Sequence, residues 1–168
     1  MKAKLIINGQ EFEVEISDKQ VKELTKNKQT VYEKVSINQY YYYVPDDSDG
    51  ACSFKQEDDS SDDALYEAAN YYSSKEVAEN NLRADKLMRQ LRRFAVLNRK
   101  EKIDWSKENQ SKYFIIFNRN NSEIYPTSSI KLQEQGTIYF DSKEIVEKAI
   151  KEFHDELFWY FTEYKDSL

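Results

Sequence analysis

Short stretches of this chain alternate hydrophobic and polar residues, and two long stretches repeat hydrophobic residues at helical spacing. In residues 4–16 the alternation follows Asn8-Gly9, and both of these residues accept the positive φ of a type I′ turn. We therefore expect an N-terminal β-hairpin there. The following Ser17-Asp18-Lys19-Gln20 has the spacing of a capping box, which predicts a short helix that extends through Leu24.

The aromatic region that comes next predicts a second pair of strands. Residues 31–35 and 39–44 have the composition of strands and are separated by a Ser-Ile-Asn turn. Pro45 ends the second of these strands, because proline has no amide hydrogen to donate to a sheet. Residues 46–63 then contain eight acidic residues and one lysine. Such a segment has little to bury, so we expect a mobile acidic loop.

Two long helices are predicted to begin in the same way. Tyr71-Tyr72-Ser73-Ser74-Lys75-Glu76 opens the first, and Tyr139-Phe140-Asp141-Ser142-Lys143-Glu144 opens the second. In each copy an aromatic pair ends a strand, and a serine at the fourth position of the motif is placed to cap the helix. Hydrophobic residues then recur at helical spacing to about Asn98 in the first copy and Tyr164 in the second.

The second copy is preceded by strand signals, as the first is. Its expected strands and turn lie at residues 112–118, 119–122, 123–125 and 137–140. The fold class is therefore predicted to be α+β. Residues 1–38 are expected to form the hairpin and short helix, and residues 39–102 and 103–168 to form two similar strand–strand–helix units. In these units an antiparallel sheet is expected to pack on the two long helices.

Composition limits the classes of function. The 168 residues suffice for one domain or two small ones, and the 13 Tyr and 9 Phe supply much of the core. The net charge of −6 argues against non-specific binding of nucleic acid or anionic membrane by the whole surface. No apolar run approaches the roughly 18 residues of a membrane span, and the N-terminus lacks a signal-peptide pattern. We therefore expect a cytoplasmic protein without membrane contact, which agrees with the single Cys52.

No residue pattern predicts catalysis, a cofactor or a metal site. Cys52 is surrounded in the sequence by acidic residues, which oppose a thiolate, and the only histidine is the distant His154. The acidic run before Gly50 is similar to the start of a calcium loop, but Pro45 and Gln56 would then occupy two of the main ligand positions. We expect a protein that is not an enzyme and that uses no cofactor or metal.

Three groups of residues are candidates for partner binding. They are the acidic Asp46, Asp47, Asp58, Asp59, Asp62 and Asp63, the aromatic Tyr40 and Tyr42, and the basic Arg89, Arg92 and Arg93. Concentrated acids steer a protein toward a basic partner, exposed tyrosines supply contact area, and clustered arginines hold phosphates or carboxylates bidentately. Each group also has a structural interpretation, namely a solvated loop, sheet packing and a solvated helix face.

Several of these segments, taken in order, resemble a known group of proteins. They are residues 41–44, 71–76, 104–105, 112–116 and 136–144. Over about residues 39–165 the chain resembles small accessory proteins of phages, prophages and other mobile elements of Gram-positive bacteria. The resemblance carries over no catalytic residue.

Some small acidic proteins of such elements inhibit host defences, including as anti-CRISPR proteins. The resemblance therefore implies a non-enzymatic binding or inhibitor protein in the host cytoplasm. Its partner would be a host protein or nucleoprotein, including a nucleic-acid-binding effector. The alternative is a regulator that binds nucleic acid directly through the arginine-rich helix face.

Overall fold

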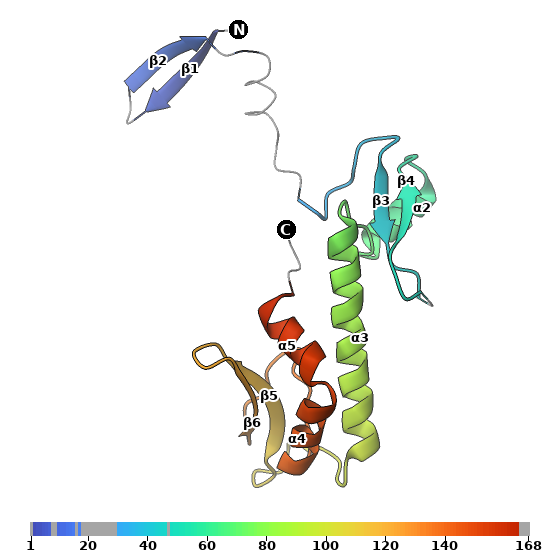
Figure 1. Cartoon of the computed structure of the whole chain (residues 1–168), viewed down its shortest axis with the longest axis vertical. Helices are drawn as coiled ribbons and strands as arrows, with labels where there is room; N and C mark the ends of the chain where they lie inside the picture. Colours follow the sequence, from blue (N-terminus) through green and yellow to red (C-terminus); the bar gives the residue numbers. More distant parts are fainter. Residues whose placement is uncertain (1, 8–9, 16, 18–29, 47, 165–168) are drawn as a thin grey trace.

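The computed structural model describes residues 2–7, 10–15, 17, 30–46 and 48–164 (Figure 1). Within these residues the chain is a mixed α+β protein with three two-stranded antiparallel sheets and four helices. The predicted α+β class is thus confirmed. The short helix expected after Ser17 and the candidate residue Asp47 lie outside the described residues.

The N-terminal hairpin is confirmed at the level of strand pairing. Strand β1 (Lys2–Ile7) pairs antiparallel with β2 (Gln10–Glu15), and the register places Leu5 opposite Phe12. The two strands flank the Asn-Gly pair that predicted the turn.

The predicted partner of the aromatic strand is wrong. Strand β3 (Tyr40–Tyr43) pairs antiparallel with β4 (Cys52–Lys55), which lies inside the segment that was expected to be a mobile loop. Residues 31–35 form no strand. Instead Val31 is buried in a small core with Tyr72, and its carbonyl accepts a hydrogen bond from the Ser73 amide at 2.8 Å. The hydrophobic residues that suggested a strand there are used to cover this core.

Helix α2 (Ser60–Glu67) begins within the acidic segment, so the prediction of a mobile loop is wrong there as well. The Asp59 carboxylate accepts hydrogen bonds from the amides of Ser61 (2.8 Å) and Asp62 (3.0 Å). The Asp62 carboxylate in turn accepts from the Asp59 amide (3.3 Å), which completes a capping box. Composition predicted a solvated loop, but acidic side chains placed as caps satisfy the first amides of a helix.

Helix α3 (Lys75–Asn98) begins as predicted, because the Ser74 hydroxyl accepts a hydrogen bond from the Val77 amide at 3.4 Å. At its N-terminal end Val77 and Ala78 are buried in the same core as Tyr72. Toward the other end, buried residues of α3 pack in the main core, which also contains residues of the C-terminal half. Figure 1 shows α3 running from the β3–β4–α2 part to the C-terminal part.

The hairpin of the C-terminal half is confirmed with one extension. Strands β5 (Lys112–Asn118) and β6 (Glu123–Ser129) pair antiparallel, and β6 continues through Pro126, which lies opposite Ile115. A two-stranded sheet tolerates this proline because the strand has an unpaired edge. The strand expected at residues 137–140 is reduced to one bridge, in which Phe140 and Tyr113 exchange hydrogen bonds of 2.7 and 2.9 Å.

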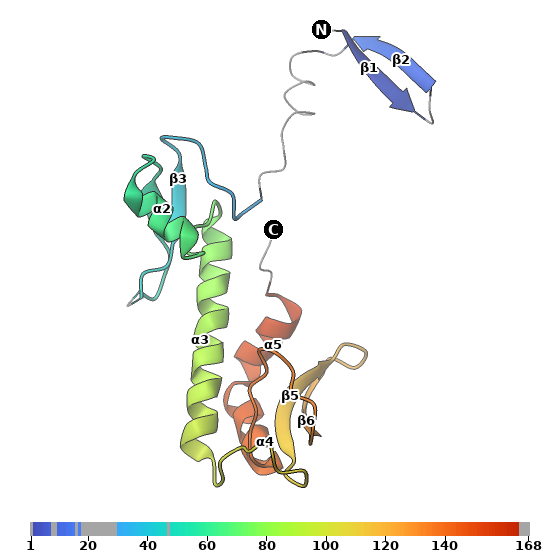
Figure 2. The ribbon, with the colours of Figure 1, turned by 180° about the vertical axis from the view of Figure 1, so that it is seen from behind.

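The last long helix is in fact two helices, α4 (Lys143–Glu152) and α5 (His154–Thr162). They meet at Phe153, whose φ of −108° and ψ of 21° depart from helical values. The ring of Phe153 packs edge-on against Phe94 of α3 at 5.7 Å. Figures 1 and 2 show α4 and α5 lying between α3 and the β5–β6 sheet.

Ser142 occupies the N-cap position of α4, as predicted, but its side chain makes no capping hydrogen bond. Its neighbour Asp141 instead accepts hydrogen bonds from the amides of Lys100 (2.6 Å) and Glu101 (2.8 Å). The start of α4 is therefore tied to the turn that follows α3.

Candidate functional site

Asp62 is not available to a partner, so its prediction as a binding residue is wrong. It is fully buried, and its carboxylate accepts hydrogen bonds from the Tyr41 hydroxyl (2.8 Å), the Glu57 amide (2.8 Å) and the Asp59 amide. Burial by itself raises the pKa of Asp62, but these hydrogen bonds outweigh it and hold the pKa below its usual value. Asp62 is a structural anion that holds α2 against β3.

The tyrosine partners of this anion are residues that sequence reasoning did not select. Tyr41 is fully buried and its ring stacks on Tyr71 with centroids 4.0 Å apart. Burial, followed by the hydrogen bond to Asp62, raises the pKa of Tyr41. The Tyr71 hydroxyl donates to Gln56 (2.7 Å) and accepts from the Val35 amide (3.0 Å). For Asp62 itself the sequence did contain a signal, because Asp-Ser-Ser-Asp at residues 59–62 has the spacing of a capping box.

The two tyrosines that were predicted to bind a partner differ in exposure. Tyr40 has 61% of its surface exposed. Tyr42 is half-buried, and its backbone exchanges hydrogen bonds of 2.7 and 2.8 Å with Tyr72. Tyr42 thus packs beside the start of α3, and Tyr40 is the one of the two that presents most of its side chain.

The other described acidic candidates lie on the surface, but two of them have partners within the chain. Asp59 caps α2, and Asp63 forms an ion pair with Lys34. Asp46 and Asp58 are exposed, and so is Asp49, which pairs with Lys86 at 3.1 Å. Such exposed ion pairs contribute little to stability, because water competes for both charges. The carboxylates of Asp49 and Asp63 are therefore accessible to a partner at small cost.

Charge is strongly segregated along the chain. Residues 39–72 contain nine acidic residues and one lysine, a net charge of −8, whereas residues 73–102 contain nine basic and four acidic residues, a net charge of +5. The acidic residues belong to the part that packs at the N-terminal end of α3. Arg92 and Arg93 lie in the C-terminal half of α3, away from these acids.

The three predicted arginines share the exposed face of α3. Arg89 and Arg93 lie about one helical turn apart, and the side chains of Arg89, Arg92 and Arg93 are all exposed. Within the described part of the chain none of the three has an ion-pair partner. In contrast, Arg83 forms two hydrogen bonds of 2.7 and 3.0 Å with Glu156. The structure thus brings the predicted basic residues together and leaves their guanidinium groups accessible.

Arg89 meets the acidic segment in a polar pocket of about 220 Å³. Asp46 and Asp85 line the same pocket, so two carboxylates and one guanidinium face a common space. Its wall is held by Asn70, whose side chain bonds both the amide and the carbonyl of Val44 at 2.8 Å. The pocket joins residues 43 positions apart in the sequence, which no local pattern could have paired. A cationic side chain of a partner would pair with Asp46 or Asp85 in this pocket, and an anionic one with Arg89.

Arg93 lines a second hollow, of about 460 Å³, between the end of α3 and α4. Its apolar wall includes Phe94, Phe153 and Leu97, and Leu97 has 75% of its surface exposed. Exposed apolar surface beside an arginine is typical of protein-binding patches. This end of α3 therefore adds an apolar contact area to the basic face.

Within the described residues, no group of three or more His, Cys, Asp or Glu side chains is arranged to hold a metal ion. Cys52 is exposed on β4, and His154 is exposed on α5 in the other half of the chain. A search of the described helices for one long and apolar enough to cross a membrane finds none. Comparisons with protein-family models, curated proteins and solved structures give no match.

Proposed function

We propose that this chain is a non-enzymatic binding protein of a phage or other mobile element that inhibits a host protein or nucleoprotein, as anti-CRISPR proteins do. The segregation of charge supports this proposal most strongly, with a net −8 over residues 39–72. The same part carries three exposed aromatic side chains, Tyr40 (61%), Phe54 (45%) and Tyr66 (42%). Acidic groups interspersed with aromatic rings provide both steering and contact area for a basic partner.

The physical route is competition for a basic groove that ordinarily holds nucleic acid. Such a groove attracts phosphates through its lysines and arginines, and carboxylates compete for the same charges. The capping box and the buried Asp62 hold the exposed acids of residues 58–63 on a defined helix start. Because these acids are already ordered, less conformational entropy is lost on binding than a mobile loop would lose.

We also propose that the two halves of the chain are copies of one strand–strand–helix unit. In each half an aromatic residue just before a helix bridges the first strand of a hairpin, Tyr72 with Tyr42 and Phe140 with Tyr113. The helix then buries an adjacent pair, Val77-Ala78 in the first half and Ile145-Val146 in the second. These correspondences support two copies of one strand–strand–helix unit, in which the first copy carries the concentrated acids and the second supports α3.

A charge-neutralised variant tests the inhibitor proposal. Asp46, Asp49, Asp58 and Asp63 are replaced by Asn, whereas Asp59 and Asp62 are kept because they hold α2. Lysate of a Gram-positive host is passed over immobilised wild-type and variant protein, and bound proteins and nucleic acids are identified. Wild type should retain a basic, nucleic-acid-binding protein, and the variant should associate with it more slowly and with a smaller salt dependence.

The matched control changes the charge by the same amount in the other half of the chain. Glu144, Glu147, Glu152 and Asp155 are exposed on α4 and α5 and are replaced by their amides. This control should associate with the captured protein as wild type does. Equal association rates for wild type, variant and control would exclude the acidic part as the binding surface.

The exposed arginines favour a second candidate, direct binding of nucleic acid by a regulator. The observation is that Arg89, Arg92 and Arg93 have no ion pair within the described residues. If they bind phosphates, a gel shift should be seen at low salt and should weaken steeply as salt rises. Arg92→Glu with Arg93→Glu should abolish it, whereas Lys131→Glu with Lys143→Glu should not. No shift of wild-type protein at low salt would remove this candidate.

A further inference from the structure

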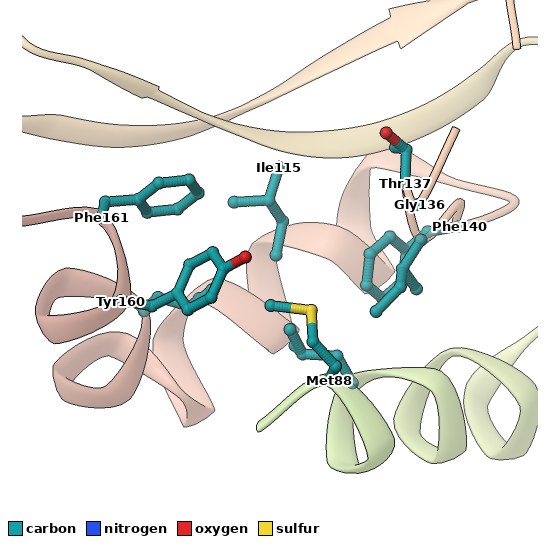
Figure 3. A pocket seen from close by; sticks show the side chains of 10 residues that line it. Met88, Ile115, Gly136, Thr137, Phe140, Tyr160 and Phe161 are labelled. Carbon is teal, nitrogen blue, oxygen red and sulfur yellow. The ribbon is translucent and has the colours of Figure 1, made fainter. Parts of the chain in front are cut away.

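We propose that the C-terminal half contains a binding site for a small, neutral, single-ring molecule that carries one hydrogen-bond acceptor. The site is a cavity of about 140 Å³ between α3, β5, residues 136–140 and α5 (Figure 3). It is separate from the charged surfaces described above, since none of the candidate acids or arginines lines it. The inference does not depend on the proposed inhibitor function.

The size and lining of the cavity indicate a ring-sized apolar ligand. Its walls are mostly aliphatic and aromatic side chains, including Met88 from α3, Ile115 from β5, and Leu157 and Phe161 from α5. Apolar cavities of roughly 150 Å³ bind benzene, so this volume is enough for one ring. The cavity is partly open to solvent, so a ligand that fills it displaces water from apolar side chains. The cavity therefore has the volume for one six-membered ring and gains apolar burial when it is filled.

One polar group defines the chemistry of the ligand further. Figure 3 shows the Tyr160 hydroxyl directed toward the space between Met88 and Ile115, whereas the Thr137 hydroxyl points away from the Tyr160 ring. In the part of the chain that the structure describes, the Tyr160 hydroxyl has no hydrogen-bond partner. Solvent reaches this hydroxyl in the empty cavity, and a ligand that displaces the water replaces its hydrogen bond best with an acceptor oxygen. No charged side chain lines the cavity, so a charged ligand would lose its hydration without compensation.

The cavity is partly open to solvent, and a turn forms part of its wall. In this turn the Thr137 amide donates to the Glu134 carbonyl at 3.4 Å, and the Glu134 amide donates to the Tyr139 hydroxyl at 2.7 Å. Gly136 lines the cavity within the turn and has a φ of 79°, a conformation that favours glycine. Because the cavity is already open, a ligand can enter without movement of the packed helices.

Methionine labelling gives a direct measurement of occupancy. The chain contains two methionines, Met1 and Met88, so ¹³C-methyl labelling produces one signal from the cavity wall and one internal control. The probes are cyclohexanone, which carries an acceptor oxygen, and methylcyclohexane, which is of similar size but has none. Each probe should shift the Met88 signal saturably and leave the Met1 signal unchanged. Absence of a saturable Met88 shift with both probes would overturn the proposal.

Two variants separate the cavity from its polar group. Tyr160→Phe should weaken cyclohexanone binding about fivefold, the typical effect of one hydrogen bond, and leave methylcyclohexane binding unchanged. Tyr125→Phe, at a tyrosine of β6 outside the cavity, is the matched control and should change neither affinity. Ile115→Trp should fill the space and abolish binding of both probes in a protein with an unchanged circular dichroism spectrum. Equal effects of Tyr160→Phe and Tyr125→Phe on cyclohexanone would overturn the assignment of the acceptor.

Discussion

Removal of the buried Asp62 carboxylate is expected to unfold the first half of the chain more readily than any other single acidic substitution there. Asp62→Ala leaves the Tyr41 hydroxyl and the amides of Glu57 and Asp59 without their acceptor. Asp62→Asn keeps the shape but offers one acceptor oxygen where the carboxylate offered two. The matched control is Asp63→Asn, at the neighbouring residue, whose carboxylate is exposed and pairs with Lys34.

The magnitude follows from the number and environment of the lost hydrogen bonds. A hydrogen bond to a charged group contributes about 1.5–3 kcal/mol, and a buried donor left without an acceptor adds a desolvation cost. The Tyr41 hydroxyl is buried, whereas the other two donors belong to exposed residues that water can reach in part. We therefore expect a loss of about 3–4 kcal/mol for Asp62→Ala and about half of that for Asp62→Asn. Asp63→Asn should cost about 0.5 kcal/mol or less.

The assay needs one probe for each half of the chain. Both tryptophans, Trp105 and Trp159, belong to the C-terminal half, so their fluorescence during urea unfolding reports on that half. Amide hydrogen exchange of Tyr41 and Glu57 reports on the first half. Asp62→Ala should accelerate exchange at both amides and lower the urea midpoint measured by circular dichroism. If Asp62→Ala and Asp63→Asn have the same midpoint and exchange rates, the structural role assigned to Asp62 is wrong.

Four further outcomes follow from the same kind of reasoning. The lowered pKa of Asp62 makes its contribution present above the ordinary carboxyl pKa and lost as pH falls through the folded value, so wild type should lose stability below about pH 4 and Asp62→Asn should lose less. The raised pKa of Tyr41 contributes below the ordinary phenol pKa, so the melting temperature should fall above about pH 10. Arg83→Met removes a guanidinium 3.9 Å from the ring of Trp159 together with its surface ion pair, and should cost about 1 kcal/mol and change tryptophan emission. Lys112→Met leaves two backbone carbonyls without the buried ammonium that they bind at 3.1 and 3.2 Å, so a loss of about 1–2 kcal/mol is expected in urea unfolding, and unchanged stability would contradict that role.

Several elements could be predicted from the sequence because the forces that form them act between near neighbours. The Asn8-Gly9 pair predicts the β1–β2 hairpin, and Ser74 predicts the start of α3, since a turn or a cap involves residues within about four positions. The continuous aromatic and β-branched run at residues 113–117 likewise predicts β5. The exposed arginines of α3 follow from the helical period once the buried stripe is known.

The features that the sequence did not predict depend on contacts between distant residues. Composition alone describes residues 46–63 as a solvated loop, but pairing with Tyr40–Tyr43 makes part of this segment into β4. The break at Phe153 arises where that side chain meets Phe94 of another helix. A strand partner or a helix break of this kind is decided by packing, which local propensity does not contain.

The candidate site shows the same division between local and distant causes. The sequence determined that acidic residues are concentrated between residues 39 and 72 and that arginines share one face of a helix, because charge and period are properties of the order of residues. Only the tertiary structure decided which acid is buried and which can meet a partner. Asp62 and Asp63 are adjacent and chemically identical, but only Asp62 meets the hydroxyl of Tyr41, 21 residues earlier. A buried carboxylate needs such donors from distant parts of the chain to offset its desolvation, and their arrival depends on the fold as a whole.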